Sequence, residues 1–177
     1  MSERVQRAII LAAGNGKRMG ALTADKPKAM LDVGGRALID HQIDALDRCG
    51  IHDVTIVVGY HQDRLRRHIG NRGLFIENPD FATTNSLYSL WLAREELARG
   101  ALIMNADILV HPELLARLVD APGDDAVLVD CSCRLADEEM KIQIWNGFAV
   151  DFGKDLAADR AHGENVGILK FGSTGGI

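Results

Sequence analysis

Hydrophobic positions along this chain alternate between short unbroken runs and stripes that recur every three or four residues. An unbroken run is typical of a strand buried on both faces, because such a strand has no solvent-facing side. A stripe is typical of a helix with one buried face. Strands are therefore predicted at residues 8–13, 54–58, 74–76, 101–104, 126–129 and 141–145. Helices are predicted around residues 39–49, 61–69 and 87–97, and from Pro112 onward.

Glycine and proline residues mark where these elements begin and end. Gly50 follows the first helical stripe, and Pro112 suits the first turn of a helix. Asn146-Gly147 is a strong signal for a hairpin between two strands. Because strands and helices alternate with short links, the pattern predicts the α/β class, as a three-layer α/β/α fold with a mostly parallel, mixed sheet.

Composition agrees with one compact domain. The chain has 177 residues, 47% of them hydrophobic, which is enough for one core and too few for two ordinary domains. No apolar run is long enough to cross a bilayer, and no signal segment is recognisable. A net charge of -5 with scattered basic residues gives no nucleic-acid footprint. The three cysteines lack the spacing of a disulfide or metal framework, so we expect reduced, partly buried thiols in a cytoplasmic protein.

The residues that carry chemistry are concentrated after the first predicted strand, within residues 8–31. Gly14, Gly16 and Gly20 leave room for a ligand to approach backbone N–H groups, and phosphate oxygens are the usual ligand. This acidic chain also has four cations within twelve residues here, namely Lys17, Arg18, Lys26 and Lys28. We interpret the loop as a nucleoside triphosphate site. Its G-x-G-x-x-x-G spacing matches neither common phosphate-loop fingerprint, and a turn shaped for packing alone is the alternative.

The same segment resembles the signature of the nucleotidyltransferase family, which has a GT-A-like, Rossmann-type fold. The matching residues are Leu11-Ala12-Ala13-Gly14, Gly16, Arg18, Met19 and Lys26-Pro27-Lys28. The resemblance implies an enzyme that joins a nucleoside triphosphate to a phosphorylated acceptor and releases pyrophosphate. It implies that Arg18 holds the β- and γ-phosphates and that Lys28 neutralises charge at the α-phosphate. It further implies nucleotide contacts from Leu11, Ala12, Ala13, Gly14, Asn15, Gly16, Lys17 and Lys26.

A carboxylate follows the strand predicted at 101–104, in the sequence Asn105-Ala106-Asp107. Ligands of such sheets sit beyond the carboxyl ends of the strands. Mg²⁺ prefers few carboxylates together with phosphate oxygens and water, so Asp107 is a candidate ligand for it. The alternative is that Asp107 caps the next turn or helix. In the resembling family an acidic residue at this strand end is the first metal ligand.

Residues 78–90 are rich in amides and hydroxyls, which can read the edge of a base or cap a helix. The string N-P, then N-S-x-Y-S-L, resembles the phosphocholine cytidylyltransferase branch, whose acceptor is phosphocholine or a related small phosphate ester or phosphonate. That resemblance implies base-side roles for Asn78, Thr84 and Asn85. For Ser86 and Ser89 a capping role is equally open. An acceptor with a choline group would need an aromatic cage, for which Tyr88, Trp91 and Trp145 are the nearest candidates.

Later segments match the same branch less fully. The resemblance places Lys141 near an acceptor phosphate, and Glu164, in a glycine-bounded acidic turn at 163–168, near metal or acceptor. The alternatives are an edge-strand lysine that discourages aggregation and a turn residue without function. The family normally supplies a second metal-binding aspartate from a further strand. We therefore expect residues 1–177 to form a single nucleotidyltransferase domain lacking its C-terminal elements.

That expectation predicts binding of CTP with Mg²⁺ but weak turnover, and an exposed sheet edge that leaves self-association, for example as a homodimer, open. A second metal ligand within the chain would have to come from Glu164, Asp130 or Asp151.

The sequence as a whole predicts a Mg²⁺-dependent nucleotidyltransferase that moves a cytidylyl group from CTP to a small phosphorylated or phosphonate acceptor. A sugar-1-phosphate nucleotidyltransferase, a molybdenum-cofactor nucleotidyltransferase and a non-catalytic nucleotide-binding module remain as alternatives.

Overall fold

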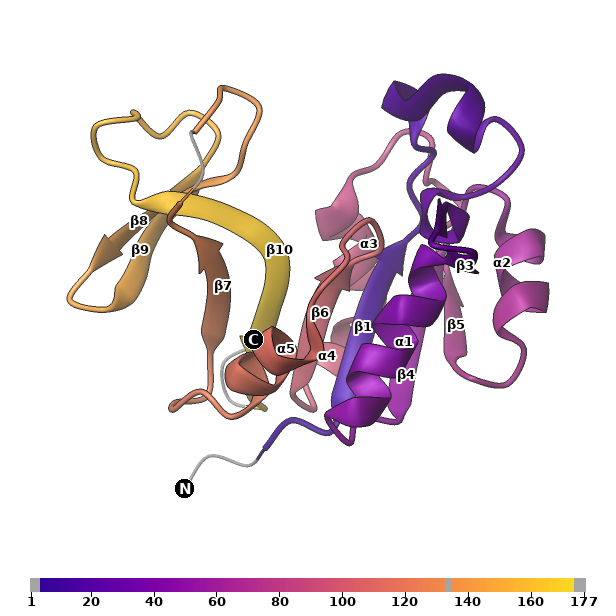
Figure 1. Ribbon diagram of the computed structural model, residues 1–177, viewed down its shortest axis with the longest axis horizontal. Helices are drawn as coiled ribbons and strands as arrows, with labels where there is room; N and C mark the ends of the chain where they lie inside the picture. The colour runs from indigo at the N-terminus through magenta and orange to yellow at the C-terminus, as the bar shows by residue number, and fades with distance from the viewer. Residues whose placement is uncertain (1–3, 133–134, 174–177) are drawn as a thin grey trace.

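A mixed eight-stranded sheet forms the centre of the computed structural model, which describes residues 4–132 and 135–173 and only the backbone of Lys17 and Arg18. The strand order is β5-β4-β1-β6-β10-β8-β9, with β7 paired to β10 (Figure 1). The strands are β1 (Arg7–Ala12), β4 (Asp53–Val58), β5 (Leu74–Glu77), β6 (Ala101–Asn105), β7 (Ala126–Asp130), β8 (Lys141–Trp145), β9 (Phe148–Gly153) and β10 (Gly163–Phe171). A separate hairpin joins β2 (Asp32–Val33) to β3 (Arg36–Ala37).

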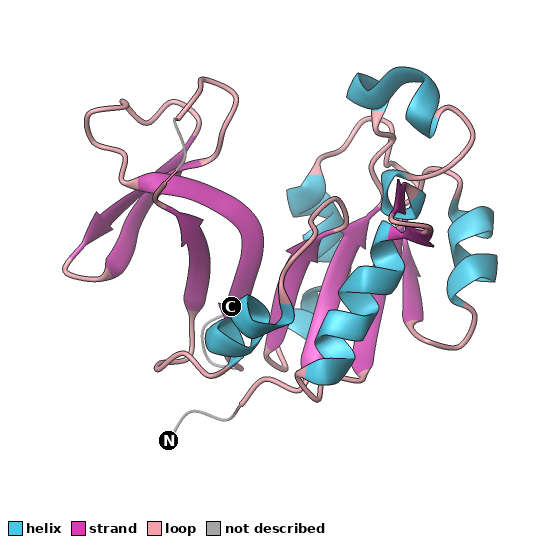
Figure 2. Cartoon of the chain, viewed as in Figure 1, coloured by secondary structure: helices cyan, strands magenta, loops and turns pink. Residues whose placement is uncertain are grey.

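Helices cover both faces of the parallel part of this sheet (Figure 2). The α-helices are α1 (Leu38–Arg48), α2 (Gln62–Ile69), α3 (Ser86–Leu92), α4 (Arg94–Leu97) and α5 (Pro112–Val119), and the short 3₁₀ helices are η1 (Lys17–Thr23) and η2 (Lys28–Met30). Figure 1 shows α1 and α5 in front of the sheet and α3 and α4 behind it. The predicted three-layer α/β/α arrangement with a mostly parallel sheet is confirmed for this part of the chain.

Strand β1 explains why the first apolar run has no polar alternation. It pairs in parallel with β4 on one side and with β6 on the other. Ala8 and Ile10 belong to the core shared with α1, whereas Ile9 and Ala13 belong to the core on the opposite face. All four are at most 4% exposed, so neither face of β1 has a place for a polar side chain.

The local turn signals also predict the structure well. Gly50 follows α1 with a φ of 74°, in the left-handed region that favours glycine. Asn146 and Gly147 connect β8 to β9 with φ values of 49° and 81°, as a two-residue hairpin requires. His111 accepts a hydrogen bond from the N–H of Glu113 and so caps α5 at Pro112.

Strand β10 contradicts the turn expected at residues 163–168. Its second half pairs antiparallel with β6, its first half pairs with β8, and β7 pairs with both halves (Figure 1). A register shift lies between Asn165 and Leu169. Gly167 has a φ of 81°, and a Cβ there would collide with the Asn105 side chain. A glycine is therefore needed at 167, because the strand is irregular there and its backbone lies close to Asn105 of β6.

The helix predicted over residues 87–97 is broken into α3 and α4 at Ala93. The hydrophobic spacing at 87–97 places Leu87 and Trp91 on the buried face of this helix, which is wrong, because they are 69% and 60% exposed. Ser89 and Ala93 are buried instead, and Leu90 packs with Ala93 against the sheet. A serine and an alanine thus occupy buried positions that hydrophobicity alone does not reveal.

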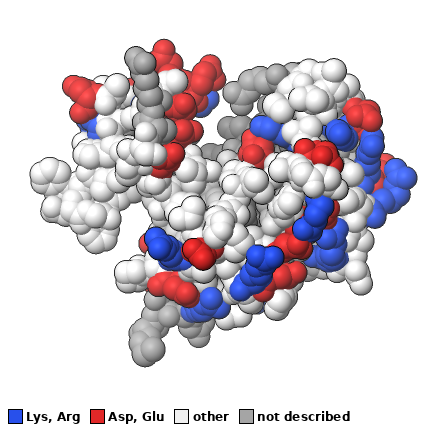
Figure 3. Space-filling view, in the orientation of Figure 1, with Lys and Arg blue, Asp and Glu red and all other residues white. Residues whose placement is uncertain are grey.

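Three further expectations concern membrane spans, surface charge and the cysteines. No helix in the described parts of the chain is long and apolar enough to span a membrane. On the face drawn in Figure 3, basic side chains over the α1 and α2 side are interspersed with acidic ones. Cys49 is buried, which raises the pKa of its thiol, whereas Cys131 is exposed; both are free, and Cys133 lies outside the described residues.

Candidate active site

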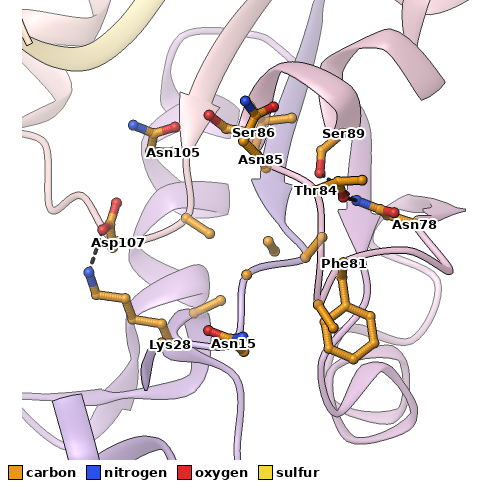
Figure 4. A pocket seen from close by; sticks show the side chains of 18 of the residues that line it. Asn15, Lys28, Asn78, Phe81, Thr84, Asn85, Ser86, Ser89, Asn105 and Asp107 are labelled. Carbon is orange, nitrogen blue, oxygen red and sulfur yellow. Dashed lines mark hydrogen bonds and ion pairs between the residues drawn. The ribbon is translucent and has the colours of Figure 1, made fainter. Parts of the chain in front are cut away.

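A pocket of about 740 Å³ opens beyond the carboxyl ends of β1 and β6. Its walls come from three segments: the loop after β1 with η2, the stretch between β5 and α3, and the turn after β6 (Figure 4). The residues that line it are Leu11, Ala12, Ala13, Gly14, Asn15, Gly16, Met19, Lys28, Ala29, Asn78, Phe81, Ala82, Thr84, Asn85, Ser86, Ser89, Asn105, Ala106 and Asp107.

The glycine loop forms the part of the wall that continues β1. A Cβ on Gly14 would meet no atom within 4 Å, so this position faces open space. Gly16 has a φ of 59°, and a Cβ there would lie 3.1 Å from the Thr23 side chain. The Thr23 hydroxyl donates to the Gly16 carbonyl at 2.9 Å, which fixes the start of η1. Backbone N–H groups of such a loop can approach an anion without a side chain in the way.

Lys28 and Asp107 meet at one end of the pocket. The ammonium of Lys28, from η2, lies 2.5 Å from Oδ2 of Asp107, which follows β6 (Figure 4). Their side chains are 32% and 38% exposed, so both groups remain accessible to a ligand. This pair is the charged end of an otherwise neutral set of lining side chains.

Asn78 organises the opposite wall. Its side chain is 1% exposed, and its amide nitrogen donates to the hydroxyls of Thr84 and Ser89, each at 3.0 Å. The amide oxygen accepts from the N–H of Asp80 at 3.0 Å. Asn85 accepts from the N–H of Tyr88 and caps α3, as the capping alternative predicted, and it also lines the pocket.

The pocket brings together most of the residues singled out from the sequence. These are Leu11, Ala12, Ala13, Gly14, Asn15, Gly16, Lys28, Asn78, Thr84, Asn85 and Asp107. Lys26 is half-buried and does not line it. The side chains of Lys17 and Arg18 lie outside the described part of the structure. Sequence reasoning missed Phe81 and Ala82, whose only signal was their position inside the 78–90 segment.

Lys141 is not available for an acceptor phosphate in this structure. It is 4% exposed, and its ammonium donates to the Lys154 carbonyl at 2.6 Å. Both sequence-based readings were therefore wrong, because this lysine is neither a pocket residue nor an exposed edge lysine. Glu164 lies on β10 opposite Asp130, and neither is among the described residues that line the pocket.

The three aromatic candidates for a choline cage are not among the described residues that line the pocket. Trp91 and Trp145 are 60% and 68% exposed, on α3 and β8. Tyr88 lines a neighbouring apolar groove on α3 and α4, together with Trp91. Among the described lining residues, Phe81 is the aromatic one.

A single carboxylate such as Asp107 suits Mg²⁺ better than it suits a metal ion held entirely by protein side chains. Among the described residues there is no group of three or more His, Cys, Asp or Glu side chains that could hold an ion. Mg²⁺ commonly takes one or two carboxylates and completes its shell with phosphate oxygens and water. A single accessible carboxylate beside a roomy polar pocket matches that requirement.

Comparison with known proteins finds nucleotidyltransferases, among them cytidylyltransferases and sugar-phosphate nucleotidyltransferases. Residues 8–143 match the model of the MobA-like NTP transferase domain. The chain is 30% identical over 182 residues to CTP:phosphoglutamine cytidylyltransferase of Campylobacter jejuni, covering 93% of this chain and 72% of that protein. It is 43% identical over 100 residues to choline-phosphate cytidylyltransferase of Streptococcus pneumoniae, covering 55% of this chain and 43% of that protein.

A solved structure of the CTP:phosphocholine cytidylyltransferase from Streptococcus pneumoniae superimposes with a TM-score of 0.68 at 28% identity. The superposition covers 94% of this chain and 71% of that one.

Proposed function

The chain belongs to the family of MobA-like NTP transferase domains, and on this basis we propose that it transfers a cytidylyl group from CTP to a small phosphorylated or phosphonate acceptor, releasing pyrophosphate. The observation that carries the proposal is the pocket itself. One cavity has a glycine-rich loop, an accessible lysine and carboxylate, and a wall of amides and hydroxyls. A nucleoside triphosphate needs these three kinds of contact, for its phosphates, its counter-ion and its base.

The glycine loop is the candidate phosphate cradle. Gly14 faces open space, so a phosphate could approach the backbone without meeting a side chain. The left-handed conformation at Gly16 begins η1, which would turn successive N–H groups toward the bound anion. Arg18 is proposed, from the family resemblance alone, to hold the β- and γ-phosphates.

Lys28 and Asp107 are proposed to manage charge during the transfer. An acceptor oxygen would attack the α-phosphorus in line, and pyrophosphate would leave on the opposite side. Lys28 would stabilise the negative charge that gathers at the α-phosphate. Asp107 would hold Mg²⁺, which, when bound, neutralises triphosphate oxygens. The protein has little covalent work to do, so its contribution is to hold the two substrates and balance charge.

The base would lie against the wall built by Asn78, Thr84, Asn85 and Ser89. The relatives named above support CTP as the donor, because both are called cytidylyltransferases. Their acceptors differ, and the single aromatic side chain among the described lining residues gives no cage for a choline group. We therefore propose the acceptor class, a small phosphate ester or phosphonate, and no individual acceptor.

The test is pyrophosphate release from each of the four triphosphates with a panel of phosphorylated acceptors and Mg²⁺. We expect release with CTP and at least one small phosphate ester or phosphonate. Release only with sugar-1-phosphates and another triphosphate would contradict the proposal in favour of a sugar nucleotidyltransferase. Triphosphate binding without any release across the panel would favour a nucleotide-binding module.

A further inference from the structure

Three side chains and one backbone segment form a directional hydrogen-bond chain behind the base-side wall of the pocket. The N–H of Asp80 donates to the amide oxygen of Asn78 at 3.0 Å. A backbone N–H can only donate, so the oxygen of the Asn78 amide must face Asp80. The amide nitrogen then faces Thr84 and Ser89, and it donates to both hydroxyls.

The two hydroxyls differ in what happens to their own protons. The Thr84 hydroxyl donates to the carbonyl of Asp80 at 2.8 Å, which closes a ring of bonds within the loop. The Ser89 hydroxyl accepts from Asn78, and within the described residues no protein acceptor takes its proton. Ser89 is 4% exposed and lines the pocket. A buried donor without a partner is unfavourable, so a ligand acceptor is the natural partner for this proton.

From its position in the pocket, Ser89 would contact the base of a bound nucleotide. In Figure 4 its side chain lies with Thr84 and Asn78 on one wall, across the pocket from Lys28 and Asp107. With the phosphates near the Lys28 and Asp107 end, the base would lie at the Ser89 end.

We propose that Asn78 is a positioning residue that occupies one lone pair of the Ser89 hydroxyl and directs its proton into the pocket, and that Ser89 thereby favours a base with an acceptor at ring position N3. Cytosine has a lone pair at N3 that can accept this proton, whereas uracil has an N–H there, which would leave the Ser89 proton without an acceptor. This inference rests on the proposed function and specifies how the same site distinguishes CTP from UTP.

The decisive variant is Asn78→Asp, because an ionised carboxylate only accepts hydrogen bonds. The Asp80 N–H keeps its acceptor, while Ser89 must now donate to residue 78 and turn a lone pair toward the base. The extra negative charge weakens both triphosphates alike, so the readout is the ratio of their dissociation constants. We expect the CTP-over-UTP preference to fall by about tenfold or more and to approach or pass unity.

Ser89→Ala provides a second variant that does not depend on the folding of an acidic substitution. It removes the donor, so CTP should bind about tenfold more weakly while UTP binding changes little. Thr83→Ala is the matched control: this exposed hydroxyl also reaches the Asp80 carbonyl, at 3.3 Å, but does not line the pocket. It should leave the preference unchanged.

Isothermal titration of the whole chain with CTP and with UTP, in Mg²⁺ at neutral pH, measures all four proteins, and circular dichroism checks that each is folded. A reduced preference in Asn78→Asp and Ser89→Ala, with none in Thr83→Ala, supports the inference. Tight CTP binding with the original preference in either folded variant overturns it and leaves the proposed function standing. Failure of the unaltered chain to bind any triphosphate overturns both.

Discussion

The ammonium of Lys28 lies 2.5 Å from a carboxylate oxygen of Asp107, and this ion pair joins segments 79 residues apart in the sequence. Both groups are proposed to act on the triphosphate, one directly and one through Mg²⁺. In the free protein each neutralises the other. Under the proposed function, binding of the metal and the nucleotide would separate the pair, and each binding event would then favour the other.

Asp107→Asn should keep the fold but lose the dependence of triphosphate binding on Mg²⁺. The neutral amide is a poor ligand for a hard cation. Because both members of the ion pair are about one-third exposed, losing it should cost at most about 1 kcal/mol of folding stability. Titration calorimetry with CTP, with and without Mg²⁺, checks the prediction. An unchanged Mg²⁺ effect in the variant would make Asp107 a purely structural partner of Lys28.

Lys28→Ala should lower kcat/KM for CTP by about 10- to 100-fold, since a charge-assisted contact is worth about 1.5–3 kcal/mol. Lys154→Ala is a matched control, because Lys154 carries the same charge, is 52% exposed and does not line the pocket. It should change kcat/KM by less than about threefold. Pyrophosphate release measures both. Equal losses in the two variants would mean that general positive charge, and not the position of Lys28, matters.

Arg18→Ala tests the role that the family resemblance assigns to this residue. We expect triphosphate affinity to fall by about 1.5–3 kcal/mol, the range for hydrogen bonds to a charged group. Calorimetry of the folded variant gives the answer. An unchanged affinity would remove Arg18 from the site.

Alanine substitutions at Gly16 and Gly14 should have different effects: the first should lower folding stability, and the second should weaken CTP binding. Gly16→Ala forces a left-handed φ of 59° on a residue with a Cβ that lies 3.1 Å from Thr23, so it should cost about 1–2 kcal/mol of stability. Gly14→Ala meets no neighbour, so it should leave stability unchanged and weaken CTP binding by filling the phosphate approach. Urea unfolding and titration calorimetry are the two measurements. A destabilised Gly14→Ala with normal CTP binding would contradict this division.

Asp40 on α1 pairs with His68 and Arg72, and the stability that these contacts contribute should be lost at low pH. Burial raises the pKa of this carboxyl, but hydrogen bonds from Arg72 and His68 outweigh it and hold the pKa below 3.8. The native state thus binds this proton less tightly than the unfolded chain. Its contribution is complete above the unfolded pKa of about 3.9 and is lost as pH falls through the lower folded value.

Asp40→Asn measures this contribution. The variant should be about 1–2 kcal/mol less stable at pH 7, after allowance for the partly exposed partners. The gap from the unaltered protein should shrink below pH ~4. Urea midpoints at several pH values test it, and a gap that stays constant from pH 7 to pH 3 would contradict it.

Local chemistry made the parallel half of the fold predictable. Continuous apolar runs mark strands such as β1, and Asn146-Gly147 marks a hairpin, because each signal depends on neighbours in the sequence. The pocket was predictable for a related reason: Gly14 and Asp107 both follow strands, and parallel strands end at one edge.

The predictions that were wrong concern residues whose structure depends on partners distant in the sequence. The strand at β10 exists because residues 168–171 pair with β6, while Gly167 needs room beside Asn105, and neither fact is visible locally. Lys141 was read as a solvent or ligand group, but the Lys154 carbonyl takes its ammonium. The hydrophobic stripe at 87–97 predicts a buried face made of large side chains, but Trp91 is exposed and the smaller Ser89 occupies a buried position.

The double pairing of β1 bears on how tightly the pocket can bind. Near the end of β1 the Leu11 carbonyl accepts from the N–H of Ala106, and just beyond the strand the Ala13 carbonyl accepts from the N–H of Tyr60. The residues that lead into the glycine loop are thus immobilised from both sides before any ligand arrives. The conformational entropy of that stretch is lost when the protein folds, so a ligand does not have to order it again. With this preorganisation, a larger part of the free energy of each phosphate contact contributes to the binding affinity.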